Sequence, residues 1–143
     1  MAYADPELIL KRWLISAVFP GAGQDRVRVE VGDLTPEEIN FQQAQRLIRI
    51  VQLASSPGDT TITLDVADLE LNWYARTRER VRELTDQTRV AMRYQLEGVT
   101  DPDTGAFIKQ ARWLSSPADT PSESSMFRRR TATARLWIHH NPL

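Results

Sequence analysis

The sequence predicts a single α+β domain over residues 1–143, in which two helices pack on one face of a mostly antiparallel sheet of four to five strands. Three observations support this fold class. The length of 143 residues is typical of one domain. Several stretches alternate strictly between apolar and polar residues, as half-buried strands do. Two stretches repeat apolar residues at spacings of three and four, as helices that cover a sheet do.

The composition excludes several classes of protein. Hydrophobic residues make up 41% and charged residues 26%, which is ordinary for a globular chain. No cysteine is present, so disulfides, cysteine-ligated zinc and a thiol nucleophile are excluded. No apolar run has the roughly 20 residues that cross a bilayer, and no signal-peptide pattern opens the chain, so we expect no membrane contact and synthesis in a cytoplasm. The net charge of −1 argues against a dedicated duplex-DNA binder.

The first predicted element is a helix. Asp5 is a good N-cap, and Pro6 suits the first helical position, where its missing N–H costs nothing. Pro20 and Gly21 end this helix. Its apolar stripe consists of Leu10, Trp13, Leu14, Ala17 and Val18. The next alternating stretch predicts a half-buried strand with one face formed by Val27, Val29 and Val31.

Two further strands are expected before the second helix. In residues 32–45, a capping signature at Thr35 and Glu38 predicts a short helix. Residues 46–53 form an apolar strand, and residues 55–59 form a turn. The strand 61–74 has an apolar face of Ala67, Leu69, Leu71 and Trp73. Its other face, which we expect to meet solvent, carries Asp68, Glu70, Asn72 and Tyr74.

The second predicted helix runs over residues 77–96 and ends before Gly98. Its buried stripe consists of Val81, Leu84, Thr88, Ala91 and Met92. A separate exposed stripe consists of Arg78, Arg82, Arg89 and Arg93.

Two strands complete the expected sheet. After a turn at residues 101–105, residues 106–115 alternate, and one side carries Phe107, Lys109, Ala111 and Trp113. Residues 115–126 are rich in Ser and Pro and predict a mobile loop. The last strand, residues 129–140, has an apolar face of Ala132, Ala134, Leu136 and Ile138, with Trp137 on the opposite face.

Motifs of known catalytic or cofactor chemistry are absent, including phosphate-binding glycine loops, G-x-S-x-G and H-E-x-x-H. His139 and His140 point to opposite faces of a strand, so we expect an exposed chain end there and no metal site. Asp68 and Glu70 share a strand face and form the one candidate acid/base couple. The solvent face of an amphipathic strand explains them more simply. We therefore expect no enzyme, cofactor or metal.

The remaining signals concern surfaces. Three consecutive arginines, Arg128, Arg129 and Arg130, lie where the predicted loop enters the last strand. A solvated loop edge is the simpler interpretation. The functional interpretation is a protein interface, because the guanidinium group binds carboxylates with two hydrogen bonds. Alternation places Arg129 on the opposite side from the other two. Trp137, Arg78 and Arg82 are the other candidate interface residues, since Trp137 lies on the face that helices do not cover.

The chain resembles the tail-terminator proteins of long-tailed, siphovirus-type phages, particularly those of actinobacterial hosts. The resemblance rests on the opening helix "DPELILKRWLISAVF", on a strand that leads through "YARTR" into a long helix, and on the closing strand "RRRTATARLWIHH". These segments occur in the family's order and extend over nearly the whole chain. The segment 32–45 and the loop 115–126 are longer than the family pattern.

The resemblance implies a structural virion protein without catalytic residues. Such a subunit forms a ring, usually of six copies, that caps the head-proximal end of the tail tube and ends its polymerisation. Its implied partners are other copies of itself, the tail tube protein and the head connector, and genome DNA passes through the ring without sequence-specific binding. Its implied location is the head–tail joint of the virion, with assembly in the host cytoplasm.

Two alternatives stay open. A head-completion or connector subunit is also small and forms rings. A small-molecule-binding α+β module would use the open sheet face near Asp68 and Glu70.

Overall fold

A computed structural model describes residues 5–21, 26–32, 46–54, 58–59 and 64–140. Two helices are each extended by a π-helical turn: α1 (Pro6–Trp13) by η1 (Leu14–Val18), and α3 (Arg78–Ala91) by η3 (Met92–Leu96). The strands are β1 (Val27–Val31), β2 (Arg46–Gln52), β3 (Gly58–Asp59), β4 (Leu64–Ala75), β5 (Phe107–Trp113), β6 (Ala118–Thr120) and β7 (Arg128–His139).

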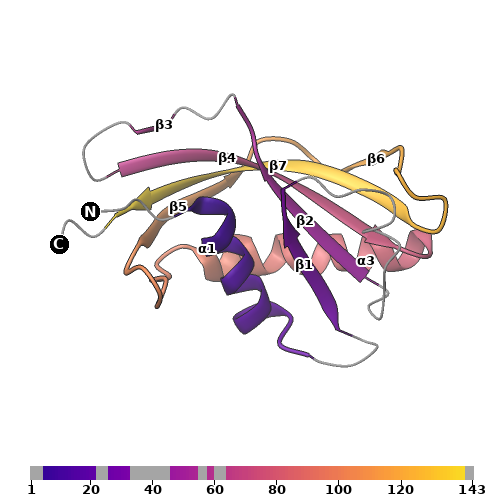
Figure 1. Ribbon diagram of the computed structural model, residues 1–143, viewed down its shortest axis with the longest axis horizontal. Coiled ribbons are helices and arrows are strands. Elements are labelled where there is room, and N and C mark those ends of the chain that lie inside the picture. Colours follow the sequence, from indigo (N-terminus) through magenta and orange to yellow (C-terminus); the bar gives the residue numbers. More distant parts are fainter. Residues whose placement is uncertain (1–4, 22–25, 33–45, 55–57, 60–63, 141–143) are drawn as a thin grey trace.

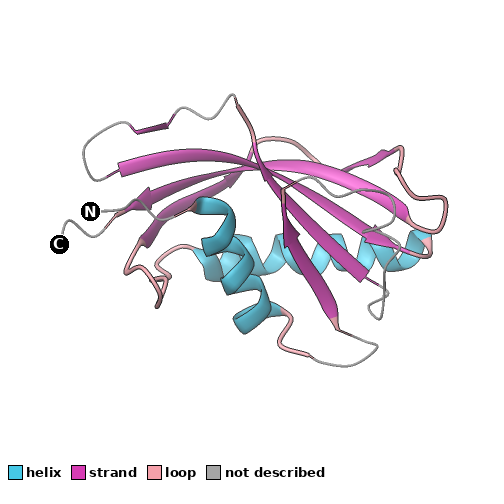
Figure 2. Cartoon of the chain, viewed as in Figure 1, coloured by secondary structure: helices cyan, strands magenta, loops and turns pink. Residues whose placement is uncertain are grey.

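The strands form one sheet with the order β1-β2-β4-β7-β5, in which β3 pairs with β4 and β6 pairs with β7. Both helices lie on the same face of this sheet (Figures 1 and 2). All pairings except that of β1 with β2 are antiparallel. The predicted α+β class, with two helices on one face of a mostly antiparallel sheet, is therefore confirmed.

The parallel pairing of β1 with β2 was not predicted. Val27 lies opposite Arg46 and Val31 lies opposite Ile50. A parallel connection needs about a dozen residues or more to return the chain to the starting edge. The long segment between the two strands satisfies that requirement. The short helix predicted at residues 32–45 lies outside the described residues, as does most of the predicted turn at 55–59, of which Gly58 and Asp59 form β3.

Both helices begin where their capping residues predict. The side chain of Asp5 accepts a hydrogen bond from the Glu7 backbone N–H at 2.9 Å. The Thr77 hydroxyl accepts one from the backbone N–H of Arg80 at 3.2 Å. Each bond satisfies a backbone donor that has no partner within its own helix.

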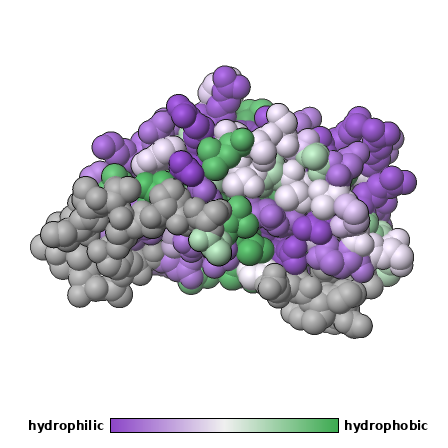
Figure 3. Space-filling view, turned by 90° about the horizontal axis from the view of Figure 1, so that it is seen from above, coloured by the Kyte–Doolittle hydropathy of each residue, from purple (hydrophilic) through white to green (hydrophobic). Residues whose placement is uncertain are grey.

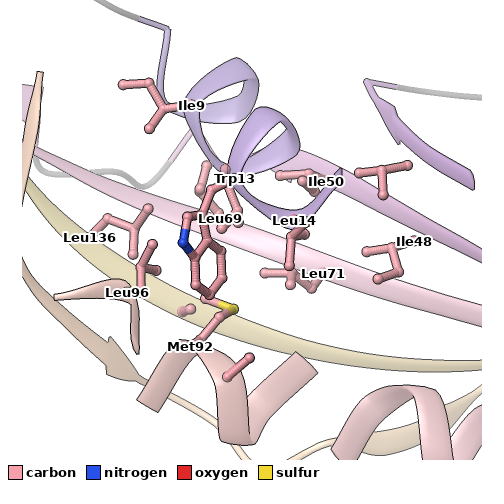
Figure 4. Packing of buried hydrophobic residues seen from close by; sticks show 14 of the residues in the cluster. Ile9, Trp13, Leu14, Ile48, Ile50, Leu69, Leu71, Met92, Leu96 and Leu136 are labelled. Atoms are coloured by element: carbon pink, nitrogen blue, oxygen red, sulfur yellow. The ribbon is translucent and has the colours of Figure 1, made fainter. Parts of the chain in front are cut away.

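The core lies between the sheet and the two helices. Figure 4 shows side chains of α1, β2, β4 and η3 converging on it. The predicted stripe of α3 is buried there, with exposures of 0–8% for Val81, Leu84, Thr88, Ala91 and Met92. Trp73 of β4 is fully buried, donates its indole N–H to the Thr88 hydroxyl at 3.1 Å, and lies 6.0 Å from the Trp113 ring. Residues from α3, β4 and β5 thus meet around one indole ring.

The prediction that Phe107 and Lys109 share one side of the strand with Ala111 and Trp113 is wrong. Phe107 and Lys109 are exposed, while Ile108 is fully buried. The register between β5 and β7 shifts between Ile108 and Gln110, so a β-bulge adds one residue. Beyond the bulge, Ala111 and Trp113 pack against the core as predicted.

The outer edge of β5 is bonded to the chain that precedes it. The Gly98 N–H donates to the Ile108 carbonyl at 2.8 Å, and the Ile108 N–H donates to the Val99 carbonyl at 2.9 Å. The Glu97 carboxylate accepts a hydrogen bond from the Ala111 N–H at 3.1 Å. These bonds satisfy edge groups that another strand would otherwise use.

The segment 115–126 contains a strand that the sequence analysis did not predict. Ala118–Thr120 form β6 and pair with β7, and Ser124 is buried. The predicted mobility of the segment stays a prediction.

A partly buried ion pair joins α1 to the turn before β5. The Arg12 guanidinium donates two hydrogen bonds to Asp101, at 3.1 and 2.7 Å, and the Thr104 hydroxyl donates a third at 2.6 Å. Burial raises the pKa of Asp101, but the hydrogen bonds from Arg12 and Thr104 outweigh burial and place that pKa below its ordinary value of 3.8.

We expect Leu84→Ala to lower the free energy of unfolding by about 2–5 kcal/mol, because it removes a fully buried side chain from the core. Chemical denaturation measures the loss. Val90→Ala, on the exposed side of the same helix, is the control and should change stability by less than about 0.5 kcal/mol. Equal losses would show that the buried face of α3 is wrongly identified.

We expect Asp101→Asn to lower the free energy of unfolding at pH 7 by about 1–3 kcal/mol, because it removes the charge that Arg12 binds. The pKa of Asp101 is depressed in the folded protein, so the carboxylate stabilises the fold above pH 3.8 and loses that effect as pH falls towards the folded-state pKa. Unfolding measured between pH 7 and pH 2 should show the wild type and the variant converging below pH 3.8. A constant difference over that range would contradict this assignment.

Candidate functional site

The sheet face away from the helices is polar, and three of its side chains on the central strand are buried. On β4, Asp68 is 4% exposed, and Asn72 and Tyr74 are fully buried. The prediction that this side of the strand meets solvent is therefore wrong for these three residues. Figure 3 shows the molecule from this side, with hydrophilic side chains over much of the described surface. Buried polar groups require partners, and the face is organised by them.

The first set of partners joins β4 to β7 through Asp68. Arg135 donates two hydrogen bonds to the Asp68 carboxylate, at 2.7 and 3.1 Å. The Arg135 guanidinium also lies 6.0 Å from the Trp137 ring centroid, so it partly covers that side chain. Asp68 is thus engaged by both donors of one arginine, a geometry that fixes the two side chains relative to each other.

A second set of bonds is centred on Asn72. Its side-chain oxygen accepts hydrogen bonds from Arg129 at 2.6 and 3.0 Å and from the Thr131 hydroxyl at 2.9 Å. Its amide nitrogen donates to Glu70 at 3.0 Å. The predicted acid/base couple therefore has both members engaged, Asp68 by Arg135 and Glu70 by Asn72.

The third set is centred on Glu123, from the segment between β6 and β7. Its carboxylate accepts hydrogen bonds from the Tyr74 hydroxyl and from Arg129, each at 3.0 Å, and lies 3.3 Å from a terminal nitrogen of Arg49. Arg49 is only 7% exposed, and its Nε has no hydrogen-bond partner among the described residues. Burial raises the pKa of the Tyr74 hydroxyl well above its usual range, although the charges of Arg49 and Arg129 oppose this shift. Tyr74 therefore stays a neutral donor.

The three consecutive arginines have three different environments. Arg129 faces the polar side of the sheet and is held by Asn72 and Glu123. Arg130 donates to the Pro117 carbonyl at 3.1 Å and lies 3.4 Å from the Asp119 carboxylate. Arg128 is exposed. The predicted alternation is confirmed, but only Arg128 remains fully available to a partner.

The other candidate interface residues are dispersed. Arg78 and Arg82 are exposed on successive turns of α3. Trp137 is half-buried on the polar face. Of these, Arg78 alone lines a groove together with Arg128.

The histidines differ from the prediction in one respect. His140 is 4% exposed, and its Nε2 lies 3.7 Å from the Asp65 carboxylate, so an exposed chain end is wrong for this residue. Within the described ranges, no three histidine or acidic side chains are placed to hold a metal ion. No helix among the described residues is long and apolar enough to cross a membrane.

Sequence reasoning missed Arg49 and Glu123, which organise this face. Arg49 did carry a signal, because it interrupts the apolar run "RLIRIVQL" at a position that alternation assigns to the same face as Leu47. Glu123 carried none, since its partners on β2, β4 and β7 are distant in sequence.

Comparisons with known proteins add little. No protein-family model matches the chain. No curated protein matches it. One solved structure, of a protein without a descriptive name, aligns with 96% of this chain and 92% of its own, at a TM-score of 0.49 and 9% sequence identity. A likeness at this level carries no argument about function.

We expect Glu123→Gln to lower the free energy of unfolding by about 1–3 kcal/mol, because it leaves the buried charge of Arg49 without its carboxylate. Chemical denaturation at neutral pH measures the loss. The matched control is Asp119→Asn, which neutralises an exposed carboxylate paired with Arg130 and should cost less than about 1 kcal/mol. A loss at Asp119 as large as that at Glu123 would contradict a special role for Glu123.

Proposed function

We propose that this chain is the tail terminator of a long-tailed phage, a ring-forming subunit that caps the head-proximal end of the tail tube. The proposal carries no catalytic role. Its implied contacts are other copies of the chain, the tube protein and the head connector.

One observation carries the proposal: the segments that resemble the family are the ones that build the centre of the fold. The strand that leads through "YARTR" into a helix corresponds to β4, the Thr77 cap and α3. The closing segment "RRRTATARLWIHH" corresponds to β7, which pairs with β4 along its whole length. The opening helix, α1 with η1, covers β1, β2 and β4. The resemblance therefore concerns one connected unit and not scattered fragments.

A second observation weakens the alternative of a small-molecule-binding module or enzyme, and leaves that of a head-completion or connector subunit open. A small-molecule-binding module or enzyme near Asp68 and Glu70 requires these carboxylates to be free to act. Both are engaged by neighbouring side chains, Asp68 by two hydrogen bonds from Arg135 and Glu70 by one from the Asn72 amide. This arrangement favours a structural role for the pair.

The test is a capping assay with the tail-tube protein that, on this proposal, the same phage encodes. Adding the purified chain to polymerising tube subunits should give tubes of limited length that carry a ring at one end in electron micrographs. Native mass measurement of the isolated ring should give one discrete multiple of 16.4 kDa, six copies being expected. Heat-denatured protein is the control. Unchanged tube lengths, with no ring at either end, would refute the proposal.

A further inference from the structure

A groove of about 480 Å³ lies between the start of α3 and the segment that leads into β7. Four arginines line it, namely Arg76, Arg78, Arg128 and Arg129. Three hydroxyl residues, Thr120, Ser122 and Ser125, line it as well. Phe127, whose ring lies 5.2 Å from the Arg76 guanidinium, and Val81 form its apolar part. The groove thus combines positive charge, hydroxyl groups and a small apolar surface.

The positive charge in this groove is only partly neutralised by the described residues. Asp119 is the one carboxylate among the lining residues, and it lies 3.4 Å from Arg130. Arg129 is bound to Asn72 and Glu123. No ion pair within the described part of the chain involves Arg76, Arg78 or Arg128, and all three are exposed. Three guanidinium groups without a carboxylate partner among the described residues therefore surround one groove.

The N-terminal end of α3 adds to the positive electrostatic potential of the groove. Arg78 is the first residue of this fourteen-residue helix, so the positive end of the helix dipole lies at the groove. A second groove, lined by Arg89, Arg93 and Arg112, lies beside the last part of α3 and η3, at the negative end. Each groove thus has several arginines, one of them stacked on an aromatic ring, but the helix dipole contributes with opposite sign to the two.

We propose that the groove lined by Arg76, Arg78 and Arg128 binds the carboxylates of a short acidic segment of a partner protein. Guanidinium groups pair with carboxylates through two hydrogen bonds, and the hydroxyl groups provide further donors. The buried Phe127 and the half-exposed Met126 provide apolar contacts that a peptide uses and a free inorganic ion does not.

An acidic peptide fits this surface better than a nucleic acid. The first two turns of α3 also carry Glu79 and Glu83, which are exposed and do not line the groove. A nucleic acid that extends beyond the groove would be repelled by these carboxylates, whereas a short segment within the groove avoids them. The net charge of the chain is −1, and the groove is too small for more than a few residues of a partner. The inference does not depend on the proposed tail function, because it rests on the groove alone.

The test measures the binding of a fluorescein-labelled hexaglutamate peptide by fluorescence anisotropy at low salt. The double variant Arg76→Ser/Arg128→Ser should weaken binding by about tenfold or more, because it removes two exposed charges from the groove. The matched control, Arg93→Ser/Arg112→Ser, removes the same charge from the second groove and should change affinity by less than about twofold.

A second variant keeps the test decisive if the first one does not fold. Ser125→Glu places a carboxylate at an exposed position of the groove and should also weaken binding about tenfold. Equal effects of both double variants, or no effect of Ser125→Glu, would overturn the proposal. Displacement of the peptide by an oligodeoxynucleotide or by inorganic phosphate at lower concentration than by unlabelled hexaglutamate would overturn the assignment to an acidic protein segment. The assay uses the isolated chain, so its outcome is separate from tube capping.

Discussion

In the antiparallel pairing of β4 with β7, every residue from Leu64 to Ala75 lies opposite a residue of the other strand, and the remaining elements are placed by this pair. Because successive side chains point to opposite faces, one register determines two different layers. The apolar layer meets α1 and α3. The polar layer brings Asp68 opposite Arg135 and Asn72 opposite Thr131. A shift of one residue would exchange the layers and bury arginines under the helices.

The polar layer can be buried only because its charges are matched. The free energy needed to remove a guanidinium group from water is larger than the free energy gained from one poorly aligned contact. Such a group therefore needs a carboxylate partner with good hydrogen-bond geometry. Arg135 has Asp68, whereas Arg49 and Arg129 share Glu123 with the Tyr74 hydroxyl. The chain before β7 is thereby tied to the sheet, and Phe127 joins Leu47 and Tyr74 in a small apolar cluster beside it. Electrostatic matching and apolar burial thus both hold this segment in place.

The sequence predicted the elements well where local rules apply. Asp5 and Thr77 marked the helix starts through their capping chemistry, and alternation identified β4 and β7 with the correct inner faces. The features that the sequence did not predict depend on contacts between residues that are far apart in sequence. A period of two is the same in parallel and antiparallel strands, so the direction of β1 relative to β2 carried no signal.

The same reasoning explains the errors on the polar face and at β5. Burial of Asp68 and Tyr74 depends on Arg135 and Glu123, which are far from them in sequence. Which of the three consecutive arginines are engaged within the chain depends on Asn72, Glu123 and Asp119. The bulge after Ile108 adds a residue without changing the composition of the strand, so alternation alone placed Phe107 and Lys109 on the wrong side.

The blocked edge of β5 bears on how this chain behaves when many copies are made together. A long open edge templates further strands and leads to uncontrolled association. Here Glu97, Gly98 and Val99 occupy the hydrogen-bonding groups of that edge, and the bulge at Lys109 disrupts its regular spacing. Copies meeting along β5 therefore gain few backbone hydrogen bonds from each other. Association along this edge would therefore depend on side-chain shape and charge and not on the pairing of strands.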